Sequence, residues 1–228
     1  RFSNETDVDF LAYTPRDYFF RTTFKEGHNM YAEGHKVSGM SRANYMPAEG
    51  WYGGRIFMAN PVNYQDDLLS TTNAFTGGGA PAATGIAVSG GGSNAAFDGA
   101  GNHHLRLQYG PSNITLFDTI YYGFQKNKLE FTIPATSLGA STTKIRHQLV
   151  NDLGVASDYQ AVAFTEITYA HTGNLESQSY YEMSIPHNTL AAKSRYDFTN
   201  FSGTNPLAFT LDGKVRKIPV VISGGTTK

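Results

Sequence analysis

The chain contains no cysteine among its 228 residues. A disulfide framework, a zinc knuckle and a thiol nucleophile are therefore excluded for this sequence. Charge of either sign is also scarce, since 16% of the residues are charged and the formal net charge is −1. Because nucleic-acid binding requires a basic surface, this balance argues against a nucleic-acid partner.

Long apolar runs are absent as well. No stretch approaches the ~20 apolar residues that a membrane-spanning helix needs, so we expect no transmembrane segment. The chain shows no signal-peptide pattern and begins with Arg1. We therefore expect it to be a mature or excised piece of a protein.

Aromatic residues and glycine are abundant, with 13% aromatic residues, 14 tyrosines and 24 glycines. This composition, without a long helical pattern, is typical of β-rich proteins. The length is enough to bury the core of one large all-β domain or of two small ones.

Alternation of apolar and polar residues is strong in the second half of the chain. Residues 103–109 place Leu105 and Leu107 on one face and polar residues on the other, and residues 109–113 have the composition of a turn. Further strands are predicted at residues 114–124, 129–134, 144–150, 161–171 and 179–185. Strands that recur every ten to fifteen residues predict an antiparallel β-sandwich of the jelly-roll kind.

The predicted sandwich covers residues 61–228, and residues 1–60 are predicted to be an aromatic N-terminal segment packed on it. Phe20, Phe24 and Tyr31 have a spacing that one helical face could use. Gly27 and Gly34, however, each weaken a helix by roughly 1 kcal/mol relative to alanine. The sequence therefore leaves this segment open between strand and short helix.

Two local features of the sandwich region give specific predictions. Residues 76–102 are rich in Gly, Ala and Ser, and we expect two loops around a short strand at residues 86–88. Near the end of the chain, Asp212 and Gly213 predict a two-residue type I′ hairpin turn.

No cofactor is expected. Residues 90–95 match the G-x-G-x-x-A variant of a dinucleotide-binding motif, but a strand follows in place of the helix that the motif requires. The tripeptide Glu-Gly-His occurs at residues 26–28 and 33–35, which would bring two histidines onto one face of a helix, or would be a chance repeat on an exposed segment. Calcium at the pairs Asp7/Asp9 or Asp66/Asp67 is possible but unsupported, because neither has the D-x-D-x-D-G spacing and solvated loop acids explain both.

Two adjacent histidines, His103 and His104, fall in a predicted strand. Their side chains must point to opposite faces of that strand. We expect one of them to be partly buried and hydrogen-bonded and the other to be exposed, so that they do not share a metal.

Catalytic motifs are not found. Ser93 lacks the second glycine of a nucleophile elbow. Glu166 and Glu182 are candidates for the paired carboxylates of a glycoside hydrolase, but solvent-facing glutamates in strands are the simpler explanation of both residues. We expect this piece to be non-enzymatic, with no catalytic residue.

The sequence AEGWYGGRIF at residues 48–57 holds the only tryptophan. Trp51, Tyr52 and Arg55 together could grip a sugar ring, and they are the candidate ligand-binding residues. Alternatively Trp51 closes one end of the core, contributing about 1.5–3 kcal/mol by burial. We favour the structural role, which predicts that Trp51→Ala lowers the melting temperature.

Three phrases follow one another in the second half: Asp-Thr-Ile-Tyr-Tyr-Gly at 118–123, Ile133-Pro134 with Leu138, and Glu-Ile-Thr-Tyr at 166–169. In this order they resemble the β-sandwich region before the caspase-like module of gingipain-family cysteine peptidases, in particular the PorU-like sortases of the Bacteroidetes type IX secretion system. Residues 12–29 and 48–57 resemble the segment leading into that sandwich, so the resemblance covers most of the chain.

This resemblance implies a non-catalytic accessory module of a protein located extracellularly or on the outer-membrane surface, after transit through the periplasm. Its partner would be a catalytic module or an outer-membrane secretion component. No catalytic residue is carried over, because the family's cysteine–histidine dyad lies in the later module. The residues alone also leave open a second function, a carbohydrate-binding jelly-roll module of a secreted bacterial protein with a glycan as its partner.

Overall fold

The computed structural model describes residues 3–4, 10–33, 49–91, 101–187, 189, 193–211, 213, 215–223 and 226–227. Within these residues the only helical elements are two short 3-10 helices, η1 (Phe10–Ala12) and η2 (Ala135–Ser137). The chain divides into two compact units. Unit 1 comprises Arg1–Arg21, Asn73–Ala80 and Ala170–Lys228, and unit 2 comprises Thr22–Thr72 and Pro81–Tyr169.

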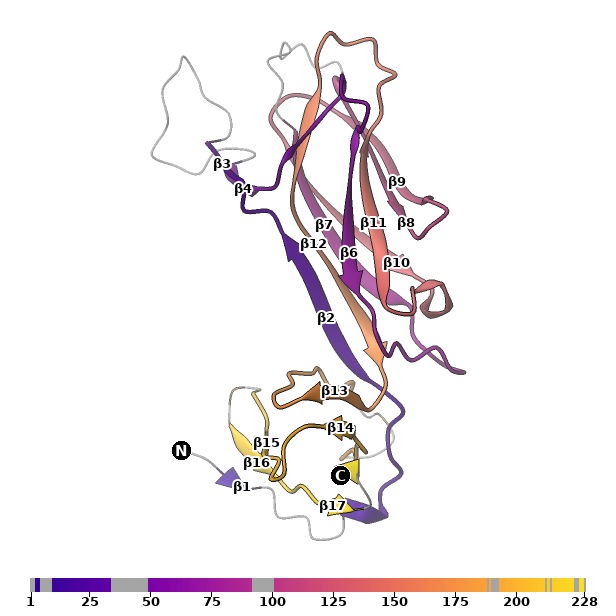
Figure 1. The fold of residues 1–228 in the computed structure, drawn as a ribbon, viewed down its shortest axis with the longest axis vertical. Coiled ribbons are helices and arrows are strands. Elements are labelled where there is room, and N and C mark those ends of the chain that lie inside the picture. The colour runs from indigo at the N-terminus through magenta and orange to yellow at the C-terminus, as the bar shows by residue number, and fades with distance from the viewer. Residues whose placement is uncertain are drawn as a thin grey trace. The chain divides into compact units, whose positions relative to one another are not determined.

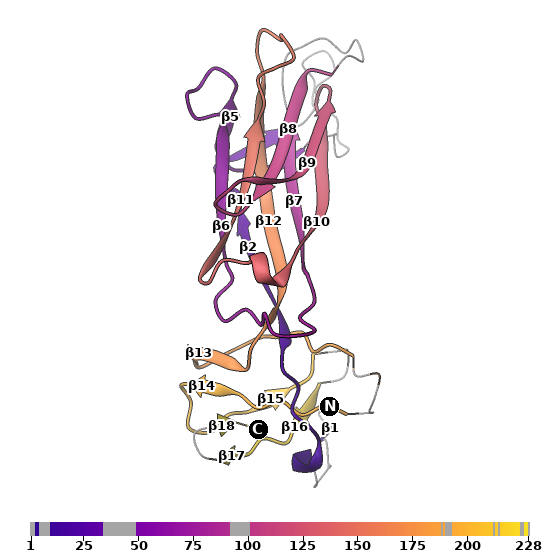
Figure 2. The ribbon, with the colours of Figure 1, turned by 90° about the vertical axis from the view of Figure 1, so that its right-hand side faces the viewer.

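Most of unit 2 is formed by two large β-sheets. The first sheet has the order β10–β7–β12–β2, with β5 also pairing with β12, and the second has the order β6–β11–β8–β9. Figures 1 and 2 show them as two layers whose strands run along a common direction. The bounds are β2 (Phe19–Glu26), β5 (Arg55–Phe57), β6 (Tyr64–Ser70), β7 (Ala83–Gly91), β8 (His103–Tyr109), β9 (Ile114–Tyr121), β10 (Lys126–Ile133), β11 (Thr142–Leu149) and β12 (Tyr159–His171).

The strand pairings of β7 with β10 and β12, and of β11 with β6 and β8, are antiparallel, as are those of β8 with β9 and β12 with β5. The predicted all-β antiparallel sandwich is therefore confirmed. The predicted turn at residues 109–113 joins β8 to β9, with the Asn113 N–H donating to the Gly110 carbonyl at 3.3 Å.

The core of unit 2 follows the alternation seen in the sequence. In β11 every second side chain is buried, and in β8 Leu105 and Leu107 are buried as predicted. Each large apolar side chain contributes about 1.5–3 kcal/mol on burial. The large apolar side chains of this core that are under 2% exposed are Leu69, Leu105, Leu107, Ile133, Ile145, Leu149, Ile167 and Tyr169.

Strand β7 corrects the expectation of two loops around a short strand. It is a nine-residue strand in the middle of the first sheet, paired on both sides. A Cβ atom on Gly85 would lie 2.3 Å from the ring of Phe131, so glycine is required there by a close approach. The glycines at positions 85 and 90 of β7 thus reflect close packing.

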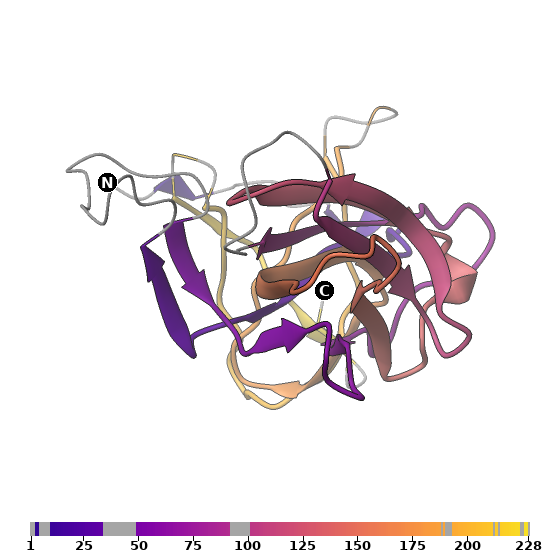
Figure 3. The ribbon, with the colours of Figure 1, turned by 90° about the horizontal axis from the view of Figure 1, so that it is seen from above.

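The sequence left the region around Phe20, Phe24 and Tyr31 open between strand and short helix, and all three residues lie in strands. After β2 come β3 (Met30–Glu33) and β4 (Glu49–Tyr52), which form an antiparallel two-stranded sheet. Figures 1 and 3 show this hairpin to one side of the large sheets. Strands β3, β4 and β5 belong to unit 2, and β2 runs from unit 1 into unit 2.

Unit 1 contains short strands in three small sheets, ordered β1–β16–β15, β13–β14 and β17–β18. Their bounds are β1 (Ser3–Asn4), β13 (Asn174–Gln178), β14 (Thr199–Phe201), β15 (Ala208–Phe209), β16 (Arg216–Ile218), β17 (Ile222–Ser223) and β18 (Thr226–Thr227). The strand predicted at residues 179–185 is wrong, because this segment makes only an isolated bridge from Ser184 to Phe20.

The predicted hairpin near the end of the chain exists as β15 and β16. Its register pairs Phe209 with Lys217, which places Gly213 at the centre of the connection. Asp212 lies outside the described residues, so the two-residue turn at 212–213 stays a prediction. Gly213 has φ +90°, which glycine adopts without strain.

Candidate functional site

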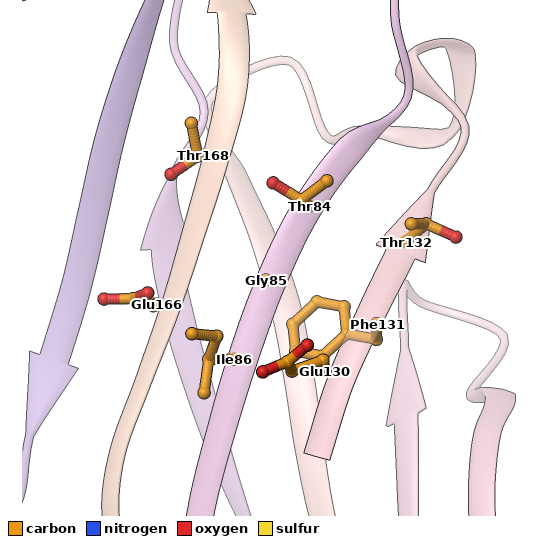
Figure 4. A pocket seen from close by; sticks show the side chains of 8 residues that line it. All are labelled: Thr84, Gly85, Ile86, Glu130, Phe131, Thr132, Glu166 and Thr168. Carbon is orange, nitrogen blue, oxygen red and sulfur yellow. The ribbon is translucent and has the colours of Figure 1, made fainter. Parts of the chain in front are cut away.

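The outer face of the first sheet of unit 2 carries a hollow of about 430 Å³. Figure 4 shows its lining, with Glu166 and Glu130 on either side of Ile86. The lining residues are Thr84, Gly85, Ile86, Glu130, Phe131, Thr132, Glu166 and Thr168.

Strand register explains why these side chains meet. Glu130 in β10 and Glu166 in β12 both pair with Ile86 in β7, so the three lie in one row across the sheet. Thr132, Thr84 and Thr168 form the next row in the same way, and alternation places both rows on the same face. The two glutamate backbones are separated by two strand spacings, or roughly 9–10 Å.

The chemistry of this hollow argues against glycoside hydrolysis. The Lys128 ammonium donates a hydrogen bond to Glu130 at 2.8 Å, and this bond lowers the pKa of the Glu130 carboxyl. A general acid needs a raised pKa, so Glu130 is a poor proton donor. Glu182, the partner that the sequence suggested for Glu166, belongs to unit 1 and lies outside its strands.

The residue that does share a row with Glu166, Glu130, was missed in the sequence. A strand was predicted at residues 129–134, and alternation along it predicts that Glu130 faces outward. The neighbouring strand β7 was not recognised at full length, so the row that joins the two glutamates could not be inferred.

The three candidate ligand residues of β4 and β5 do not converge. Trp51 is 57% exposed, whereas Tyr52 is 3% exposed and lies against Gly90, where an added Cβ would meet the Tyr52 hydroxyl at 2.7 Å. Arg55 lies over the ring of Tyr159, with its guanidinium carbon 5.1 Å from the ring centre. Alternation along β4 sends Trp51 and Tyr52 to opposite sides.

The prediction that Trp51 closes one end of the core is therefore wrong. Tyr52 is the side chain of β4 that packs against Gly90 of β7, and alternation turns Trp51 to the opposite, exposed side of the strand. Trp51 instead meets Tyr31, its cross-strand neighbour, with ring centres 5.5 Å apart and planes at 68°. Tyr31 is 49% exposed and its hydroxyl donates to the carboxylate of Glu49.

The adjacent histidines are both buried, so the expectation of one exposed histidine is wrong. His103 places Nδ1 2.5 Å from Asp158 and Nε2 3.1 Å from the Gly123 carbonyl. His104 is covered by two carboxylates, Asp152 at 2.7 Å from Nδ1 and Asp118 at Nε2. Their separate partners agree with side chains on opposite faces of β8.

The candidate metal residues that the structure describes are engaged elsewhere. Asp66 accepts two hydrogen bonds from Arg146, and Asp67 accepts from Thr165 and Gln65. His28 lies 3.0 Å from Glu26 on an exposed segment. Asp7, Asp9 and residues 34–35 of the second Glu-Gly-His lie outside the described residues. Within the described ranges no three His, Asp or Glu side chains are placed to hold a metal ion.

A polar cluster in unit 1 surrounds His171, which is fully buried. Its Nδ1–H donates to the Thr172 carbonyl at 2.6 Å, so Nε2 is left as the acceptor facing Arg21 at 3.4 Å and the Tyr181 hydroxyl at 3.2 Å. Burial is the main cause of the lowered pKa of His171. Arg21 also binds Glu176 at 2.7 Å, and the cluster therefore ties together separate segments of unit 1.

Comparison with known protein families and with curated protein sequences finds no match. Among solved structures, the chain is similar to the crystal structure of dimeric latent PorU from Porphyromonas gingivalis, with a TM-score of 0.61 and 13% identity. The similarity covers all of this chain and 20% of the PorU chain, so the chain spans about a fifth of PorU. At this identity the likeness shows a shared fold. Separately, no helix among the described residues is long and apolar enough to cross a membrane.

Proposed function

We propose that this chain is a non-catalytic β-sandwich accessory module of a PorU-like, gingipain-family protein of the cell surface, linked to type IX secretion. The observation that carries the proposal is the structural match over the whole chain to one fifth of PorU. The three sequence phrases that resemble the family support it, because they fall in the sandwich: in β9 and the turn after it, at the end of β10 with η2, and in β12.

An accessory role fits the chemistry of the chain. Without cysteine it has no thiol nucleophile of its own, and in the hollow the pKa of Glu130 is lowered by its hydrogen bond from Lys128, the opposite of what a general acid needs. The module would act by holding or covering a catalytic module, or by packing against an outer-membrane secretion component. Its location would then be extracellular or on the outer-membrane surface.

The gene that encodes this chain tests the proposal directly. We expect its reading frame to carry a caspase-like module with a cysteine–histidine dyad after residue 228, and we expect secretion genes close to it. A reading frame without such a module, in a genome without type IX secretion genes, would contradict the proposal.

The location is tested by protease shaving of intact cells followed by mass spectrometry. Peptides of this chain should be released from intact cells together with those of known surface proteins, while peptides of a periplasmic marker protein are not. Recovery of the chain only after cell lysis would rule out a surface module.

A further inference from the structure

We propose that Tyr31, Glu49 and Trp51 form a subsite that binds one pyranose ring of a glycan. These three residues are called the hairpin surface below. The observation that carries the proposal is the exposed indole of Trp51 in contact with the ring of Tyr31, whose hydroxyl donates a hydrogen bond to the carboxylate of Glu49. The inference goes beyond the accessory role, which names no glycan.

The hairpin surface is built by strand register. Tyr31 pairs directly with Trp51, and Glu49 precedes Trp51 by two residues in β4, so all three side chains lie on one face of the two-stranded sheet. The edge-to-face contact with Tyr31 holds the indole in place, while 57% of Trp51 remains open to solvent. Tyr52, on the other face, anchors the hairpin through its burial.

The chemistry of this arrangement suits a sugar. The C–H face of a pyranose ring packs on an aromatic face, and the hydroxyls at its rim need polar partners. A carboxylate accepts several hydrogen bonds at once, so the Tyr31 hydroxyl and a sugar hydroxyl can bind Glu49 together. The hairpin surface combines the apolar platform and the polar acceptor that such a ligand requires.

The size of the hairpin surface favours a sugar over a protein partner. Each ring of this kind has roughly 150–250 Å² of surface, so two half-exposed rings offer roughly 200 Å² together. A specific protein interface needs about 800 Å² on each partner. One sugar ring needs only one platform, whereas a protein would have to find most of its contact area elsewhere.

Trp51 is the only tryptophan in the chain, so its fluorescence reports on this surface alone. The full chain is titrated with hexasaccharides of β-1,4-linked glucose, xylose and N-acetylglucosamine and of α-1,6-linked mannose. We expect a saturable blue shift of the emission with at least one of them. Tyr31→Ala and Glu49→Gln should each weaken the apparent affinity, the former by about tenfold.

The matched control is Phe24→Ala, since Phe24 is an aromatic residue of β2 that is 63% exposed and lies outside the hairpin surface. This variant should bind as the unchanged chain does. Trp51→Ala should keep the melting temperature and lose retardation in gels that contain the bound glycan.

Three results would overturn the proposal. The first is no emission change with any of the four hexasaccharides. The second is a response that survives in both Tyr31→Ala and Glu49→Gln. The third is a blue shift that grows with protein concentration in the absence of sugar, together with a dimer on size-exclusion chromatography, since it would assign the hairpin surface to self-association.

Discussion

Two buried histidines in the paired strands β8 and β11 experience opposite electrostatic surroundings. His147 in β11 is enclosed between the sheets, and burial lowers its pKa to about 4 despite the nearby Asp67 and Asp66. For His104 in β8, burial acts to lower the pKa, but hydrogen bonds to Asp118 and Asp152 outweigh it and the pKa is raised. One ring is therefore kept neutral and the other favours the charged form.

The neutral ring has a defined tautomer. The Thr165 hydroxyl donates to Asp67 at 2.7 Å, so the contact of 2.8 Å between Thr165 Oγ1 and His147 Nε2 requires Nε2–H to be the donor. His147 Nδ1 is then an unprotonated acceptor, and within the described residues it has no hydrogen-bond partner. A proton added there would create a charge inside the core.

This arrangement predicts a loss of stability in acid. Between the ordinary pKa of 6.5 and the folded value of about 4, the unfolded chain binds a proton at residue 147 that the folded chain does not. The free energy of unfolding should therefore fall as the pH drops through this window, by on the order of 3 kcal/mol. In His147→Gln the free energy of unfolding should depend less on pH between 6.5 and 4. Urea unfolding followed by far-UV circular dichroism at a series of pH values measures this dependence, called the acid slope below.

His104→Gln provides the control. A raised folded pKa gives stability that is complete below pH 6.5 and is lost as the pH rises through the folded value. This variant should therefore lose stability most clearly below pH 6.5 and leave the acid slope in place. An acid slope unchanged in His147→Gln would show that this ring is not held neutral.

At the scale of elements, β7 shows how glycine can serve the middle of a sheet. Gly85 faces the interior where the ring of Phe131 fills the space that a Cβ would occupy. Overpacking of this kind costs about 1–3 kcal/mol. Gly85→Val should lower the urea midpoint of unit 2 accordingly, because the Phe131 ring or the Glu166 backbone must move.

Gly54→Ala is the matched control for that substitution. Gly54 also belongs to unit 2, but an added Cβ meets nothing within 4 Å, so its midpoint should stay unchanged. Combining Gly85→Val with Phe131→Leu should recover part of the loss. Equal midpoints for Gly85→Val and the unchanged chain would refute the packing role of Gly85.

Alternation predicted strands such as β11, in which every second side chain is buried and those between are more exposed. Strand β7 was predicted too short because its glycines at 85 and 90 lie against Phe131 and Tyr52, which come from other strands. The segment at 179–185 had the right composition, but it lacks a neighbouring strand along its length. Trp51 was misjudged for a related reason: alternation separates it from Tyr52, but only the packing of Tyr52 against Gly90 of β7 decides which of them is buried.

Prediction of the candidate sites was limited in the same way, because it also depends on contacts between strands. The sequence offered single residues, such as Glu166 and Trp51, but their companions Glu130 and Tyr31 are brought to them by strand register. Register between distant strands depends on the assembled sheets, and short local patterns do not encode it. The sequence therefore indicated which residue types could form a site, but it did not predict which residues are brought together.

At the scale of the whole molecule, the apolar core is divided unevenly. Among the described residues, the buried apolar side chains of unit 1 are Phe19, Ala170 and Leu175, and all others belong to unit 2. The strands β14 to β18 of unit 1 are only two or three residues long. Few buried apolar contacts and short ladders lower the free energy needed for local opening.

Hydrogen exchange should therefore separate the two units. We expect amides of β14 to β18 to exchange through local opening, while those of β7, β8, β11 and β12 exchange only with global unfolding. Within unit 1, the amides around His171 should be slowest, because its cluster joins Arg21, Tyr181 and the Thr172 carbonyl. Mass spectrometry of peptic fragments over a denaturant series measures each opening energy. Equal opening energies in the two units would mean that unit 1 draws its stability from something other than its own sparse core.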